Sequence, residues 1–186
     1  RPPTHTGVPR SVSGPVDGQA ERRGKMSMRD EIIRVARGEL GSADNRDIQD
    51  IHELDKYFRD VGKNPNGADK TTSWCGIFAC WVLQQAGLPV RWNCKIVDAT
   101  NRRLKLIDAN CDPQKGGGDK GKGIQRGDVG VILHRTHHFI VEEAFPGEDL
   151  LLTISGNYLG RQHDCITRTR EYKRSGLYYY YRIMDD

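Results

Sequence analysis

Residues 71–89 read TTSWCGIFACWVLQQAGLP, and their apolar pattern predicts a helix from about Cys75 to Ala86. The apolar side chains cover most of the circumference of this helix, which is typical of a helix at the centre of a domain. Gly87 and Pro89 are stop signals that end it. The rest of the chain is therefore expected to fold around this segment.

Cys75 lies in the first turn of this helix. The main-chain N–H groups and the positive end of the helix dipole stabilise a thiolate there, so we expect a pKa below the ordinary value of about 8.5. This position makes Cys75 a candidate nucleophile, and a buried structural cysteine is the alternative. Cys80 has no such environment and is expected to be a small buried side chain.

The sequence on either side predicts an α+β domain in which helices precede a sheet. Helices are expected over residues 28–40, with Ser27 as N-cap, and over 47–61, and a short helix is expected within 95–110. From about residue 124, β-branched and aromatic runs bounded by turn residues predict an antiparallel sheet of about five strands. These runs are GDVGVIL (127–133), HHFIVEEAF (137–145), LLLTIS (150–155), DCITRTREY (164–172) and GLYYYYRIM (176–184). The four consecutive tyrosines in the last run are expected to alternate between the two faces of the sheet.

Residues 1–27 are rich in Pro, Gly, Ser and Arg and have no apolar periodicity, which predicts a flexible tail or linker before a domain at 28–186. The formal charge of the chain is +4, and the first 27 residues carry five basic and two acidic side chains. The remaining part is therefore nearly neutral, which argues against nucleic-acid binding. No apolar run approaches the roughly 20 residues that span a membrane, and no apolar signal-peptide core is present.

A cysteine nucleophile needs a base, usually histidine, and a third group that orients the base. His137 and His138 open the second predicted strand, and Asn157 closes the third in ISGN. Neighbouring antiparallel strands would bring Asn157 back toward the histidine pair. The sequence therefore predicts a Cys, His and Asn site where the central helix meets the sheet.

A cysteine at the start of a helix after Trp, followed by GDVGVI, HHFIVE and ISGN in that order, resembles the CHAP family of cysteine- and histidine-dependent amidohydrolases and peptidases. The resemblance covers about residues 70 to 160. It implies a papain-like fold, in which N-terminal helices carrying the cysteine pack on the C-terminal antiparallel sheet. It also implies hydrolysis of an amide bond through an acyl-enzyme, without a cofactor or metal.

Carried over residue by residue, the resemblance makes Cys75 the nucleophile, His138 the base and Asn157 the group that orients the base. His137 is the less favoured alternative, because one residue further along a strand points to the opposite face. The oxyanion hole would be formed by the N–H group of Cys75 and a donor in TTSW, Ser73 or Thr72.

The chain departs from the family pattern in one place, because Ser155 stands where the family often has Glu two residues before the Asn. Either Asn157 alone orients the base, or a carboxylate from elsewhere, such as Glu142, supplements it. Trp74 and Tyr158, next to the nucleophile and the Asn, are expected to line the substrate groove. Ordinary packing is the alternative for both aromatic residues.

The resemblance implies peptidoglycan as the substrate, cleaved by an amidase or endopeptidase activity. We expect an antibacterial effector or a lysin domain, secreted or delivered to the periplasm or cell wall of a target bacterium, with an immunity or inhibitor protein as a further partner. Two alternatives remain open. One is a papain-like toxin that acts on a protein as a protease, deamidase or acyl transferase, and the other is an inactive binding module.

The other cysteines leave two further alternatives. Cys94 and Cys111 could form a disulfide across residues 95–110, or all cysteines other than the nucleophile could be reduced. A metal set is less attractive, because no close cysteine pair has the spacing of structural zinc sites. The less favoured metal set would consist of His134, His137, His138, His163 and Cys165. The Gly- and Lys-rich run at 111–128 lacks a complete phosphate-loop motif and is expected to be a surface loop.

Overall fold

The computed structural model of the chain describes residues 26–41, 44–66, 74–109, 118–132, 137–156 and 165–184. Apart from its last two residues, the predicted tail at 1–27 lies outside this part. In chain order the elements are α1 (Met28–Gly38), β1 (Asn45–Asp47), the 3-10 helix η1 (Ile51–Leu54), α2 (Asp55–Asp60), α3 (Trp74–Gln85), β2 (Val90–Trp92), β3 (Ile96–Asp98), β4 (Leu104–Asp108), β5 (Val129–Ile132), β6 (His137–Ala144), β7 (Leu150–Gly156), β8 (Cys165–Lys173), the 3-10 helix η4 (Arg174–Gly176) and β9 (Leu177–Ile183).

Two of the predicted helices form as expected. α1 begins after Ser27, whose hydroxyl accepts a hydrogen bond from the main-chain N–H of Asp30. α3 covers the apolar segment, and ten of its residues are buried. The helix predicted over 47–61 forms only from Ile51 onward, because β1 and a turn occupy the preceding residues.

The main sheet has seven strands in the order β1-β8-β7-β6-β5-β9-β4, and every neighbouring pair is antiparallel. The five predicted strands are confirmed as its central part, from β8 to β9. The sequence did not reveal the edge strands β1 and β4. The expected alternation of the four tyrosines is also confirmed, because Tyr181 packs in one core cluster and Tyr180 in the other.

The helix predicted within 95–110 is wrong, since β3 and β4 occupy this region. The turn between them is built around Asp98, which accepts hydrogen bonds from the main-chain N–H groups of Thr100, Arg103 and Leu104. Burial alone would raise the pKa of the Asp98 carboxyl, but these donors and the Thr100 hydroxyl outweigh it and lower the pKa to about 2. The Asp98 carboxylate therefore accepts hydrogen bonds from main-chain N–H groups that, in a helix, would donate to main-chain carbonyl oxygens.

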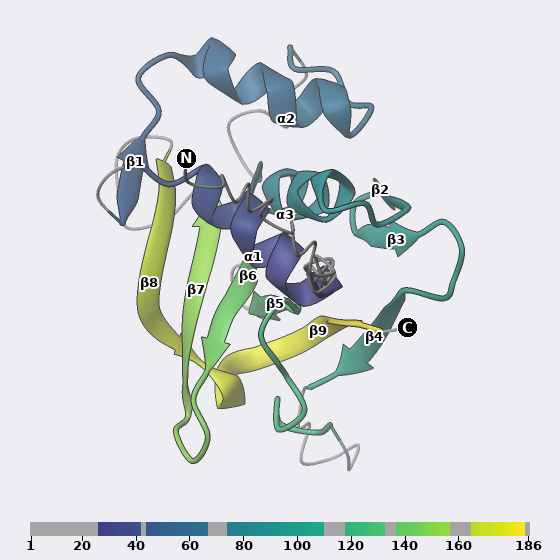
Figure 1. Cartoon of the computed structure of the whole chain (residues 1–186), viewed down its shortest axis with the longest axis vertical. Coiled ribbons are helices and arrows are strands. Elements are labelled where there is room, and N and C mark those ends of the chain that lie inside the picture. The colour runs from purple at the N-terminus through teal and green to yellow at the C-terminus, as the bar shows by residue number, and fades with distance from the viewer. Residues whose placement is uncertain are drawn as a thin grey trace, which may run out of the picture.

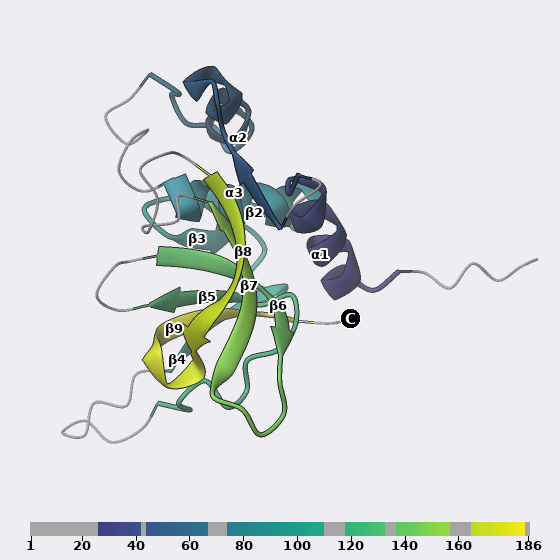
Figure 2. The same ribbon diagram turned by 90° about the vertical axis from the view of Figure 1, so that its left-hand side faces the viewer.

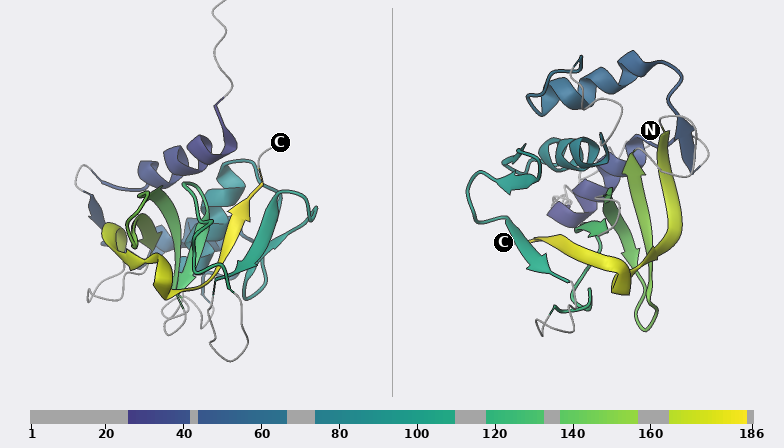
Figure 3. Two further views of the ribbon diagram at one scale, coloured as in Figure 1. Left: turned by 90° about the horizontal axis from the view of Figure 1, so that it is seen from below. Right: turned by 180° about the vertical axis from the view of Figure 1, so that it is seen from behind.

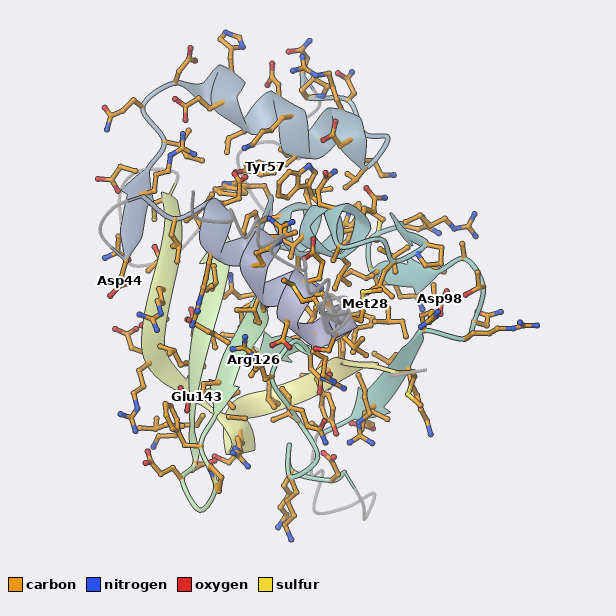
Figure 4. All side chains as sticks on the ribbon, in the orientation of Figure 1. Met28, Asp44, Tyr57, Asp98, Arg126 and Glu143 are labelled. Carbon is orange, nitrogen blue, oxygen red and sulfur yellow. The ribbon has the colours of Figure 1, made fainter. Side chains whose placement is uncertain are left out.

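The molecule is layered, with α1 and α3 over one face of the sheet (Figure 1). α3 packs on β6 and β7, and α2 covers the side of α3 that faces away from the sheet (Figures 1 and 2). Tyr57, labelled in Figure 4, fills the space between α2 and α3 by stacking on Trp74 and meeting Phe78 edge to face. The main core lies between the helices and the sheet, and a smaller cluster lies on the opposite face around Phe139 and Tyr180.

These layers confirm an α+β fold in which helices precede a large antiparallel sheet. The separate hairpin of β2 and β3 lies next to α3 and beside the β4 edge of the sheet, as the views from the front and from behind both show (Figures 1 and 3). None of the helices in the described part of the chain has the length and apolar character required to cross a membrane.

Candidate active site

The start of α3 places Cys75 against the beginning of β6. The Sγ atom of Cys75 accepts a hydrogen bond from the main-chain N–H of His138, with 3.5 Å between nitrogen and sulfur. These two residues are 63 positions apart in the sequence, and both side chains are almost entirely buried. The fold therefore brings together the predicted nucleophile and the strand position of the predicted base.

The pKa of Cys75 differs from the expectation drawn from its helix position. Burial raises the pKa of this thiol, and the N–H groups of His138, Gly76 and Cys75 itself offset only part of that rise. The expected lowering is therefore wrong for this conformation, because burial favours the neutral thiol. Cys80 is fully buried, as predicted, and this burial raises its pKa to about 12.

This difference leads to a prediction for alkylation by iodoacetamide. Because only the thiolate reacts, modification of Cys75 is expected to be slow at pH 7 and to accelerate only as the pH rises above the ordinary pKa of a cysteine thiol. Peptide mapping by mass spectrometry follows each cysteine separately, with the exposed Cys94 as a reference for the reagent and the buried Cys80 as a matched control in the same helix. Modification of Cys75 at pH 7 as fast as that of Cys94 would contradict the prediction.

The two histidines at the start of β6 point to opposite faces of the sheet. The His138 ring lies on the α3 side, 5.4 Å from the Trp92 ring and 6.4 Å from the Tyr181 ring, measured between centroids. The His137 ring lies 5.7 Å from the ring of Tyr172, which packs with the cluster on the other face. The structure therefore places His138, and not His137, on the same side of the sheet as the nucleophile helix.

Glu142 does not support the base. It lies four residues beyond His138 on β6, about 13 Å along the strand. Its buried carboxylate forms ion pairs with Arg37 of α1 and with Arg168 of β8, the second at 2.5 Å. The prediction that Glu142 supplements Asn157 in orienting the base is therefore wrong, and this carboxylate instead joins α1 to the sheet.

Ser155 lies opposite Thr167 across β7 and β8 and is fully buried. Its neighbour Gly156 faces α3, because a Cβ at residue 156 would stand 2.2 Å from the Trp74 ring. Alternation along the strand then directs Ser155 to the opposite face, away from His138. Its hydroxyl does not substitute for a carboxylate at the base.

Trp74 does not line a groove in this structure. Its side chain has no exposed surface and stacks on Tyr57, with ring centroids 5.9 Å apart and an angle of 10° between the planes. Gly156 also packs against this ring. The packing role, which the sequence also allowed, is the one observed, because consecutive helix residues point about 100° apart and Trp74 faces away from Cys75.

Sequence reasoning missed Trp92, the last residue of β2. A Cβ at Gly76, the residue after the nucleophile, would stand 2.2 Å from the Trp92 ring, so this ring lies directly on the first turn of α3. The same ring meets His138 edge to face and is partly exposed. An aromatic residue just before the turn Asn-Cys-Lys was the only sequence signal, and it did not reveal the distant contacts.

Several predicted site residues lie outside the described residues: Asn157, Tyr158, Ser73, Thr72, His134, His163 and Cys111. Their roles stay predictions. Cys94 is a free thiol in this structure, which does not contain the disulfide that the sequence allowed between Cys94 and Cys111. The metal set is divided, because His137 and His138 face opposite sides of the sheet. Within the described ranges, no three His, Cys, Asp or Glu side chains are grouped to hold a metal ion.

Comparisons of the chain with protein-family models, with curated proteins and with solved structures gave no match. The resemblance to the CHAP family therefore rests on the order of the motifs in this chain. The site itself rests on the contact between Cys75 and β6.

Proposed function

We propose that this protein is a cysteine-dependent amidohydrolase or peptidase of papain-like type that cleaves an amide bond in peptidoglycan. One observation carries the catalytic part of the proposal: the Sγ atom of Cys75, at the N-terminus of α3, lies 3.5 Å from the main-chain nitrogen of His138. Acyl transfer through cysteine needs the base side chain within hydrogen-bond reach of the nucleophile, and this main-chain contact supports that pairing because it brings the two residues together.

The chemistry begins from a thiol, because the pKa of Cys75 is raised by burial. In the proposed first step the His138 imidazole takes the thiol proton while Sγ bonds to the carbonyl carbon of the amide. The tetrahedral intermediate then loses its amine, which leaves with the proton from the imidazolium. Water, deprotonated by His138, then attacks the thioester carbonyl. The intermediate collapses, the imidazolium returns its proton to the leaving thiolate, and the carboxylic acid product loses a proton to water as it ionises.

The substrate class comes from the resemblance to the CHAP family and not from the site geometry. The same resemblance supports a role as an antibacterial effector or lysin domain that acts on the wall of a target bacterium. An immunity or inhibitor protein would be the natural partner of such an activity, because the cell that produces the enzyme has the same type of bond in its own wall and must protect it.

The test is mass spectrometry of soluble products released from purified peptidoglycan by the intact protein and by Cys75→Ala. We expect fragments with newly exposed amino and carboxyl termini from the intact protein only, and their masses identify the bond. Walls of several cross-link chemistries are needed, because the bond is not specified by the sequence. If folded intact protein releases nothing from any wall, the peptidoglycan substrate is wrong and protein substrates are tested next.

A binding module without catalysis is the second candidate, and the burial of the site favours it. Only 3% of Cys75 and 4% of His138 is exposed, and the residue at the family's Glu position is Ser155. In this case the intact protein and Cys75→Ala would sediment equally with insoluble peptidoglycan, and neither would release fragments.

A further inference from the structure

The ring of Trp92 contacts both the first turn of α3 and the His138 imidazole. The planes of the Trp92 and His138 rings meet at 75°, the edge-to-face arrangement that aromatic pairs prefer. The Trp92 ring also occupies the volume that a side chain at residue 76 would need, since Cη2 and Cζ3 would stand 2.2 Å and 2.6 Å from a Cβ there. The absence of a side chain at Gly76 therefore makes room for the Trp92 ring.

Tyr181 of β9 contacts the same imidazole. The rings of His138 and Tyr181 are nearly parallel, with 21° between their planes. The Tyr181 hydroxyl accepts a hydrogen bond from the main-chain N–H of Ile96 at 3.3 Å. Ile96 lies directly opposite Trp92 in the hairpin of β2 and β3. The two aromatic residues that contact His138 are thus connected through one hairpin.

We propose that Trp92 is a positioning residue, which fixes the orientation of the His138 imidazole beside Cys75 and is itself held by Gly76. This inference rests on the proposed function, in which His138 is the base. The two rings restrict rotation of the imidazole about its side-chain bonds. A base displaced by about 1 Å from its working position loses about 10²-fold in rate, so such restriction has a direct effect on turnover.

The first measurement is steady-state hydrolysis of a soluble peptidoglycan fragment by Trp92→Leu, Trp92→Phe and Arg91→Ala. Trp92→Leu is expected to lower kcat by about 10²-fold with little change in KM. Trp92→Phe, which keeps an aromatic edge, is expected to recover most of this loss. Arg91→Ala is the matched control, because Arg91 is the exposed neighbour of Trp92 on β2. A rise in KM at constant kcat would overturn the proposal and assign Trp92 to substrate binding.

The second measurement is independent of activity. Ring currents from Trp92 and Tyr181 displace the NMR signals of the His138 ring protons, which are assigned with His138→Gln. We expect Trp92→Leu to move these signals and Trp92→Phe to restore them in part. Gly76→Ala is expected to move them as well, because its Cβ pushes Trp92 away, but to have no further effect when combined with Trp92→Leu.

The two measurements separate this inference from the proposed function. Unchanged His138 signals in both Trp92→Leu and Gly76→Ala overturn the positioning role, whether or not the protein hydrolyses peptidoglycan. Displaced signals in a protein that is inactive on every wall support the contact while rejecting the proposed function. If Trp92→Leu does not fold, Trp92→Phe and Gly76→Ala are compared with the unaltered protein instead. Displaced His138 signals in both variants support the positioning role, and unchanged signals in both overturn it.

Discussion

We expect amide hydrolysis to fall to the same residual rate in Cys75→Ala, in His138→Ala and in the double variant. This rate should be about 10⁴- to 10⁶-fold below that of the unaltered protein. The nucleophile and its base act as a unit, so removing the second member costs little once the first is gone. The contact between Cys75 and the start of β6 is the structural reason to expect such a unit. Initial rates on a soluble peptidoglycan fragment provide the measurement.

The controls come from the neighbouring residues of the same types. Cys80→Ala removes another buried thiol from α3, and His137→Gln alters the histidine that faces the opposite side of the sheet. Both variants are expected to keep most of the activity. Losses that multiply in the double variant, or an equal loss in His137→Gln, would show that Cys75 and His138 do not act together.

Asp128→Ala is expected to lower the free energy of unfolding by about 3–5 kcal/mol, because it removes one partner of a buried ion pair. The fully buried Asp128 carboxylate accepts from the Arg29 guanidinium at 2.8 Å and from the main-chain N–H of Ile183 at 2.9 Å. Arg29 also donates to the carbonyl groups of Arg126 and Ile183. The start of α1, the turn before β5 and the end of β9 are joined at this point.

Urea unfolding followed by tryptophan fluorescence measures this effect. Asp30→Ala is the matched control, since Asp30 is exposed and its ion pair with Arg126 spans 3.2 Å at the surface. Its unfolding midpoint is expected to change little. Equal midpoints for the two variants would contradict a stabilising role for the buried pair of Arg29 and Asp128.

The parts of the fold that could be predicted have strong periodicity. α3 and the strands β5 to β9 consist of apolar or alternating runs bounded by turn residues, and each was found within a residue or two. β2 and β3 have only three residues each, which is too short for a pattern to emerge. Asn101 shows why the helix predicted within 95–110 fails, because its φ of 57° belongs to a turn.

In the candidate site, too, residues in regular elements could be predicted, and residues whose role depends on distant contacts could not. Cys75 and His138 could be predicted because each opens a regular element, and the sheet alternation distinguishes His138 from His137. Trp92 could not, since its role depends on a contact with Gly76 across the fold. The pKa of Cys75 was missed because the helix position is visible in the sequence, whereas the burial that outweighs it is a property of the packed structure.

The two glycines that hold tryptophan rings have an evolutionary consequence. Gly76 leaves room for Trp92, and Gly156 leaves room for Trp74, with 2.2 Å between each hypothetical Cβ and the nearest ring carbon. In diverged sequences with this fold, a side chain can appear at 76 or 156 only when the partner tryptophan becomes smaller. The pairs 76 with 92 and 74 with 156 are therefore expected to covary, and this signal would identify distant relatives even where the cysteine itself has been lost.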